Sequence, residues 1–190
     1  MIKAVVFDNF GVLTTDTWRA FVDSLPEGID IGKARELNRA YDAGTISHKD
    51  FLDGVKEVTG RQPQEVESLL QSDIAKNLPL LKYIGELKQR GLKIGLLSNI
   101  ATNWIRDSFL TPAEQKLFDE MILSYEVGMT KPDPRMFQLA CKRLGVDASE
   151  AVLVDDISPY CDAARHTGMQ AITYEDFKQA KQALEALLSE

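Results

Sequence analysis

The sequence predicts an α/β fold: a doubly wound, Rossmann-like core in which helices cover both faces of a parallel sheet, with a small helical subdomain inserted after the first strand. Short apolar runs alternate with amphipathic helical segments over most of the chain, and this alternation is typical of βα units. Residues 18–77 depart from it, because their pattern is helical throughout. We therefore assign residues 1–15 and 78–190 to the core and residues 16–77 to the insert.

The predicted strands are short, rich in aliphatic residues and followed by turn or polar residues, as expected of strands that are buried on both faces. They cover residues 4–7, 92–97, 121–123, 151–154 and 170–172. In the core helices, apolar residues recur at helical spacing and proline or glycine marks several of the ends. These helices are predicted at residues 79–90, 102–110, 112–118, 134–144, 158–167 and 177–187.

Four short helices account for the insert. The first follows the polar joint at residues 14–17, which offers a helix cap, and the second covers residues 33–42. Residues 47–50 form a capping-box pattern ahead of the third helix, and Pro63 fits the first turn of the fourth. The helical pattern continues to about Asn77, so a small all-helical unit is expected here.

Composition excludes several classes of function. The 190 residues are 44% hydrophobic and 27% charged, as in ordinary globular proteins. A net charge of -7 argues against a nucleic-acid partner, and the longest apolar runs are too short to cross a membrane. The first residues lead directly into a strand without a signal-peptide pattern, and the two cysteines lack metal-ligand spacing, so we expect a cytoplasmic protein, either monomer or homodimer.

Polar residues follow several of the predicted strands, where doubly wound sheets bind their ligands. They are Asp8, Ser98, Asn99, Lys131, Asp155 and Asp156. A carboxylate can attack phosphorus, and a hydroxyl and a lysine can hold the phosphoryl group. The remaining carboxylates suit Mg²⁺, which prefers oxygen ligands. Together these residue types form a chemically coherent set for phosphoryl transfer.

Four segments of the chain, in this order, resemble the motifs of the haloacid dehalogenase-like hydrolase superfamily: residues 7–13 (FDNFGVL), 96–99 (LLSN), 131–134 (KPDP) and 154–156 (VDD). The helical insert is similar to the small helical cap of that family. The resemblance implies Asp8 as the nucleophile, with Ser98 and Lys131 as phosphate holders. It thus implies a phosphatase that passes through an aspartyl-phosphate.

The same resemblance implies a Mg²⁺ site. Asp8 and Asp156 would be ligands, together with the backbone carbonyl of Phe10, and Asp155 would be a ligand or a partner of one. Residues expected near the substrate are Asn99, Gly11, Phe10 and Trp18, with Phe21 and Tyr41 as further positions on the cap. Gly11 also allows the tight turn that follows Asp8.

Phe10 departs from the family pattern. Family phosphatases carry a second aspartate two residues after the nucleophile, and this aspartate protonates the leaving alkoxide and then activates water. General acid–base help contributes roughly 10²–10⁴-fold, so we expect low turnover. The alternative for Phe10 is that it simply packs beneath the cap.

Three other activities stay open at this stage. In a 2-haloacid dehalogenase an aromatic residue occupies the Phe10 position and an arginine such as Arg39 binds the substrate carboxylate, although Phe137 replaces an expected tyrosine. A phosphonate hydrolase needs a cap lysine, for which Lys49 is the candidate. A catalytically impaired relative would act as a binding protein.

Overall fold

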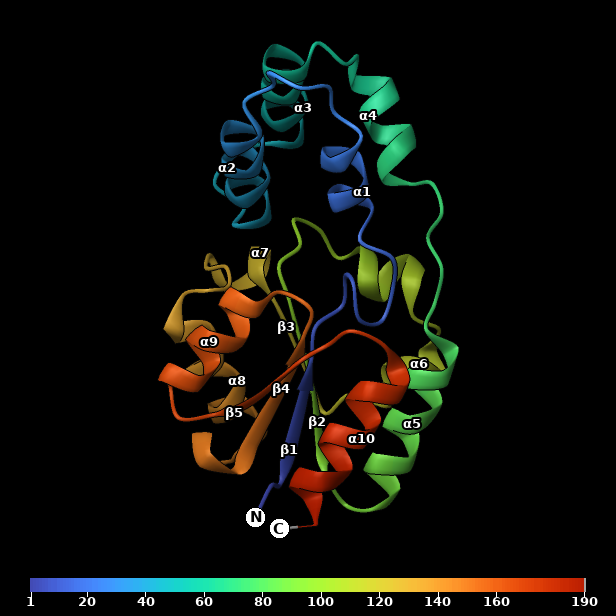
Figure 1. The fold of residues 1–190 in the computed structure, drawn as a ribbon, viewed down its shortest axis with the longest axis vertical. Coiled ribbons are helices and arrows are strands. Elements are labelled where there is room, and N and C mark those ends of the chain that lie inside the picture. The colour runs from blue at the N-terminus through green and yellow to red at the C-terminus, as the bar shows by residue number, and fades with distance from the viewer. Residues whose placement is uncertain (190) are drawn as a thin grey trace.

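The computed structural model describes residues 1–189 as a sheet-containing core beneath a helical unit (Figure 1). The strands are β1 (Ala4–Phe7), β2 (Lys93–Ser98), β3 (Glu120–Leu123), β4 (Ala151–Asp155) and β5 (Gln170–Thr173). They form a five-stranded sheet in the order β3-β2-β1-β4-β5, and every neighbouring pair is parallel. The predicted fold class is therefore confirmed.

Helices cover both faces of the sheet (Figure 1). Helices α5 (Leu78–Gln89) and α10 (Phe177–Leu188) lie on one face, and α8 (Pro134–Leu144) and α9 (Ser158–His166) on the other. The β1 residues alternate between them: Val5 and Phe7 join the first apolar cluster, whereas Ala4 and Val6 join the second. Because both faces of the sheet are buried, the sequence of β1 is a continuous run of apolar residues.

The chain between β2 and α8 is less regular than predicted. Residues 102–110 form only a π-helix, η1 (Ile105–Phe109), and α6 (Pro112–Gln115) is shorter than the predicted helix. The side-chain amide of Gln115 donates to the carbonyls of Arg106 and Leu110 at 2.7 and 3.0 Å, so these carbonyls are satisfied without a longer helix. A short helix directly after β3 and a 3₁₀ turn before β4 were not predicted: α7 (Ser124–Val127) and η2 (Ala148–Glu150).

The cap contains four helices around its own apolar cluster. They are α1 (Thr17–Asp23), α2 (Ile31–Asp42), α3 (His48–Thr59) and α4 (Pro63–Leu70). Phe21, Phe51 and Val66 are among the buried members of this cluster, which is separate from the two clusters of the core. The predicted capping box at the start of α3 is present, because the Ser47 and Asp50 side chains each bond the other's backbone N–H.

Residues 71–77, predicted to continue the helical pattern, are irregular. They run beside the segment that enters the cap, where Asn77 N donates to Leu13 O at 2.9 Å and Thr14 and Lys76 form an antiparallel bridge. Pairing with residues 13 and 14, rather than local propensity, accounts for this conformation. The domain boundaries at residues 15 and 78 stay a prediction.

One hydroxyl joins the cap to the core away from these two segments. The Ser124 Oγ, at the start of α7, lies 2.6 Å from the carbonyl oxygen of Asp42 at the end of α2. It also lies 3.0 Å from the carbonyl oxygen of Ile100 and accepts from Ile100 N at 2.8 Å. The C-terminal end of α2 is thereby fixed next to the loop that follows β2.

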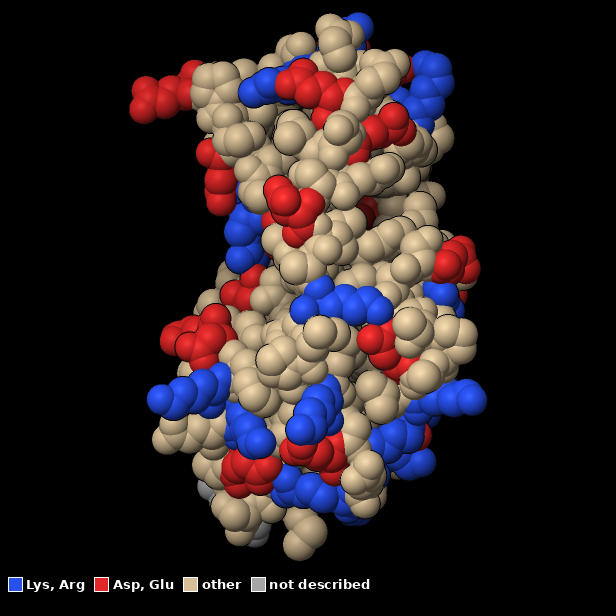
Figure 2. All heavy atoms as spheres, turned by 90° about the vertical axis from the view of Figure 1, so that its right-hand side faces the viewer, with Lys and Arg blue, Asp and Glu red and all other residues tan. Residues whose placement is uncertain are grey.

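On the face shown in Figure 2, basic and acidic side chains are intermixed over the core and do not gather into a basic patch. Among the helices of residues 1–189, none combines the length and apolar character required to cross a bilayer.

Candidate active site

Asp8 lies at the carboxyl end of β1, where Asp8 N still pairs with Val154 O at 2.9 Å. Its side chain is buried, with 5% of the residue exposed. The Oδ1 atom accepts from Asn9 N at 2.7 Å and contacts the Lys131 Nζ at 2.8 Å. Burial raises the pKa of the Asp8 carboxyl well above its usual value, while Lys131 acts in the opposite direction.

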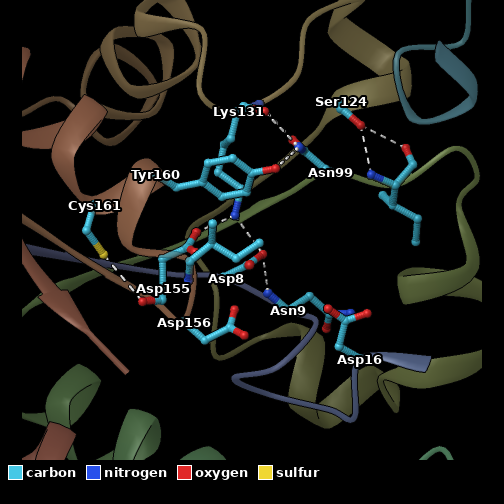
Figure 3. A network of polar contacts seen from close by, with 12 residues as sticks. Asp8, Asn9, Asp16, Asn99, Ser124, Lys131, Asp155, Asp156, Tyr160 and Cys161 are labelled. Carbon is cyan, nitrogen blue, oxygen red and sulfur yellow. Dashed lines mark hydrogen bonds and ion pairs between the residues drawn. The ribbon is translucent and has the colours of Figure 1, made fainter. Parts of the chain in front are cut away.

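Lys131 is completely buried, and its ammonium lies between two carboxylates (Figure 3). Its Nζ is 2.8 Å from Asp8 Oδ1 and 2.6 Å from Asp155 Oδ2, and it lies 5.2 Å from the centre of the Tyr160 ring. Burial lowers the pKa of this lysine, but Asp155 and Asp8 outweigh burial, so the net shift is upward. The lysine is therefore charged when it faces the nucleophile.

Ser98 is the last residue of β2, and Asn99 follows it directly. The Asn99 side chain binds the Lys131 backbone twice, accepting from its N–H at 2.8 Å and donating to its carbonyl at 3.0 Å. Asn99 thus fixes the position of the lysine and also lines the cavity described below. The Ser98 hydroxyl is fully buried and has no hydrogen-bond partner within residues 1–189, which is uncommon for a buried hydroxyl.

Three carboxylates meet at the ends of β1 and β4. Asp8, Asp155 and Asp156 each offer an oxygen, and these oxygens lie within 4.8 Å of one another. A Cβ on Gly11 would lie 2.3 Å from Asp156 Oδ2, and Gly11 has a φ of 80°. Only glycine therefore allows this close approach of the first motif to the fourth.

The donor set fits a hard divalent cation, because carboxylate oxygens are ligands that such ions prefer and because Lys131 balances only part of the negative charge of the three groups. In the described part of the chain the Phe10 carbonyl oxygen accepts no hydrogen bond, so it is open to a further contact. Arg19 of α1 partly balances the charge, with its Nη2 2.6 Å from Asp156 Oδ2.

The Phe10 side chain stacks on the core. Its ring lies 6.0 Å from that of Trp104 at an interplanar angle of 13°, and Trp104 in turn stacks on Phe109 at 5.0 Å. Phe10 also lines the cavity, so its ring is both a packing element and part of the site wall.

A cavity of about 1020 Å³ lies between cap and core and reaches Asp8 and Lys131. Trp18 lines this cavity and also packs on Phe21 and Phe51, with ring centroids 5.3 and 5.7 Å apart. Phe21, a sequence candidate for substrate contact, is instead buried in the cap cluster. The other cap candidates, Tyr41 and Arg39, do line the cavity.

Two site residues were missed from the sequence. Tyr160 lies over Lys131, and an aromatic residue in the first turn after the Asp155–Asp156 motif was a usable signal. Arg19 reaches Asp156 only because of how the cap docks, and no local pattern indicates it. Lys49 is exposed and pairs with Asp53, outside the residues that line the cavity.

The model of a family described as haloacid dehalogenase-like hydrolase matches residues 2–168. Acyl-CoA dehydrogenase family member 10 of Mus musculus is 36% identical over 98% of this chain, which spans only 19% of that protein. Phosphatase MT3486 of Mycobacterium tuberculosis is 29% identical, over 90% of this chain and 86% of its own. A HAD family enzyme from Bacteroides thetaiotaomicron shares the fold, with a TM-score of 0.74 at 22% identity over 95% of this chain and 98% of that one. A second structure of that enzyme, at a TM-score of 0.67, holds magnesium and inorganic phosphate.

Proposed function

The chain belongs to the haloacid dehalogenase-like hydrolase family, and from this premise we propose that it is a Mg²⁺-dependent phosphatase acting on a small phosphorylated metabolite through Asp8. The observation that carries the proposal is the buried Lys131, whose ammonium contacts both Asp8 and Asp155. A cation fixed beside a carboxylate at the end of β1 suits an anionic substrate that the carboxylate attacks. The similarity to the phosphatase MT3486 supports this assignment.

The two carboxylate oxygens of Asp8 differ in their contacts, which suggests different roles for them. Asn9 N and Lys131 Nζ both contact Oδ1 and fix the carboxylate in place. We assign the attack on phosphorus to Oδ2, which gives an aspartyl-phosphate. Lys131 balances the charge of the phosphoryl oxygens, and the unpartnered Ser98 hydroxyl donates to one of them.

Mg²⁺ would be held by Asp8, Asp156 and the Phe10 carbonyl, with Asp155 as a ligand or as the partner that orients one. When bound, the ion reduces the repulsion between an anionic nucleophile and an anionic substrate. The magnesium- and phosphate-bound relative from Bacteroides thetaiotaomicron supports this choice of metal.

Phosphate release from 4-nitrophenyl phosphate, in Mg²⁺ and in EDTA, tests the proposal. We expect slow, Mg²⁺-dependent turnover that is abolished in Asp8→Asn and retained in Asp162→Asn, an exposed control on α9. Wild-type turnover no higher than that of Asp8→Asn would refute the phosphatase assignment.

Dehalogenation is the second candidate, since Phe10 and Arg39 both line the cavity. Against it, Asp155 and Asp156 place two further carboxylates beside Asp8, and such a group suits a bound cation, which attack on carbon does not need. Chloride release from 2-chloropropionate in EDTA would establish it. If neither activity appears, Phe10→Asp separates the remaining cases: gained phosphatase activity means a site that lacked only its acid, and no gain favours a binding protein.

A further inference from the structure

The cavity above Asp8 is larger than a phosphoryl group requires, and its wall is mostly apolar. Its volume of about 1020 Å³ reaches the upper end of the ~300–1,000 Å³ that encloses drug-sized ligands. Phe10 and Trp104 line it from the core, and Trp18 and Tyr41 from the cap. The part of a substrate beyond its phosphate therefore meets aromatic surface.

The core side of this wall is a built aromatic row. Phe10, Trp104 and Phe109 stack in succession, with centroid distances of 6.0 and 5.0 Å and interplanar angles of 13° and 23°. Stacking of this kind restricts the orientations of the rings, and of the three only Phe10 and Trp104 line the cavity. The row begins two residues after Asp8, and Asp8 and Phe10 line the same cavity.

Other acids of the cavity wall are engaged inside the cap. Asp16 accepts from Arg19 N at the start of α1, and Asp42 accepts from the Asn38 side chain at 2.9 Å. Glu67 forms an ion pair with His48. Phe10, two residues after Asp8, has no proton to donate to a leaving group.

From the aromatic wall and the lack of a proton donor in the Phe10 side chain, we propose that the substrates are phosphomonoesters of phenols, whose oxygen leaves readily as an anion and whose ring packs against the wall formed by Phe10 and Trp104. This inference rests on the proposed phosphatase function. Asp8 forms a bond to phosphorus while the phosphorus–oxygen bond to the ring breaks, and its electron pair leaves as phenolate, which takes a proton from solvent. Water then attacks phosphorus, releasing inorganic phosphate, the Asp8 carboxylate and a proton to solvent.

Three esters and acetyl phosphate test the two halves of the inference in Mg²⁺. Phenyl and cyclohexyl phosphate match in size but differ in leaving-group acidity, and we expect kcat/KM to favour phenyl by about 10²–10⁴-fold. The 2-naphthyl ester has a similarly acidic leaving group and a larger ring, and we expect it to exceed phenyl phosphate by at least about tenfold. Acetyl phosphate provides a good leaving group without a ring.

Substitutions of Phe10 and Trp104 test whether these two residues cause the preference for a substrate that carries an aromatic ring. Phe10→Leu and Trp104→Leu keep apolar bulk but remove the stack, and each should lower the ratio of kcat/KM for 2-naphthyl over acetyl phosphate by about tenfold. Phe177→Leu, on α10 and outside the cavity lining, is the matched control and should keep the wild-type ratio. Circular dichroism confirms that each variant is folded.

The outcomes are separable. If no phosphate compound, acetyl phosphate included, is hydrolysed faster than by Asp8→Asn, the phosphatase function itself fails. If phosphates are hydrolysed but cyclohexyl and phenyl esters react alike, or the 2-naphthyl ester has no advantage, the phenolic substrate class is overturned and the phosphatase stands. A ratio unchanged in both leucine variants likewise overturns the role of the wall.

Discussion

Replacing Lys131 by methionine tests whether the buried charge cluster is as the structure shows. The change keeps most of the side-chain length but removes the ammonium that contacts Asp8 at 2.8 Å and Asp155 at 2.6 Å. Both carboxylates would remain buried without a cation partner. Breaking a buried pair in this way costs about 3–5 kcal/mol, and because two carboxylates lose their partner we expect the upper part of that range.

Urea unfolding in EDTA measures this cost directly. Lys142→Met, at an exposed site on the same chain, is the control and should change the free energy of unfolding by less than about 0.5 kcal/mol. In a double-mutant cycle, Asp155→Asn should destabilise the wild type but restore part of the stability lost in Lys131→Met. A loss below about 1 kcal/mol in Lys131→Met would refute the reasoning, because the carboxylates would then have to be neutral or hydrated.

Two further predictions concern the cap. Arg19→Ala should increase Mg²⁺ affinity about two- to fivefold, because a half-exposed ion pair to Asp156 no longer competes for the carboxylate. Calorimetric titration measures the affinity, and Arg35→Ala is the control. Unchanged or weaker Mg²⁺ binding in Arg19→Ala would contradict the prediction. Burial raises the pKa of Asp42 to about 7, with Asn38 opposing and Asp16 assisting. Its protonated form is favoured in the folded state, so stability falls as pH rises from the unfolded pKa towards 7. We expect the wild type to lose about 2–3 kcal/mol more than Asp42→Asn between pH 5 and pH 8 in urea unfolding, and equal losses would show that Asp42 titrates normally.

The strands of the core could be predicted to within one residue at each end. Their apolar runs are continuous because both faces of the sheet are buried, and glycine or proline punctuates the flanking helices. The motif residues could be placed at one edge for the same reason, since parallel strands end together.

Features that depend on contacts between distant segments could not be predicted. The irregular chain around η1 depends on the Gln115 amide reaching the carbonyls of Arg106 and Leu110. The extended segment before α5 pairs with residues more than 60 positions earlier, as in the bond from the Asn77 side chain to Val12 O. Arg19 finds Asp156 only after the cap has docked. The periodicity of apolar residues predicts local secondary structure and burial, but it does not predict which distant residues form hydrogen bonds or ion pairs with one another.

The Ser124 hydroxyl has a consequence for how cap and core separate. It has a single proton but two carbonyl acceptors, Asp42 O at 2.6 Å and Ile100 O at 3.0 Å, while Ile100 N donates to it throughout. When the end of α2 moves away, the proton can turn to Ile100 and no buried donor is stranded. The Asp42 carbonyl, freed at a helix end, meets water. We therefore expect that breaking the hydrogen bond between Ser124 and Asp42 costs little free energy. The other contacts between cap and core would then determine how easily the two separate to admit a substrate.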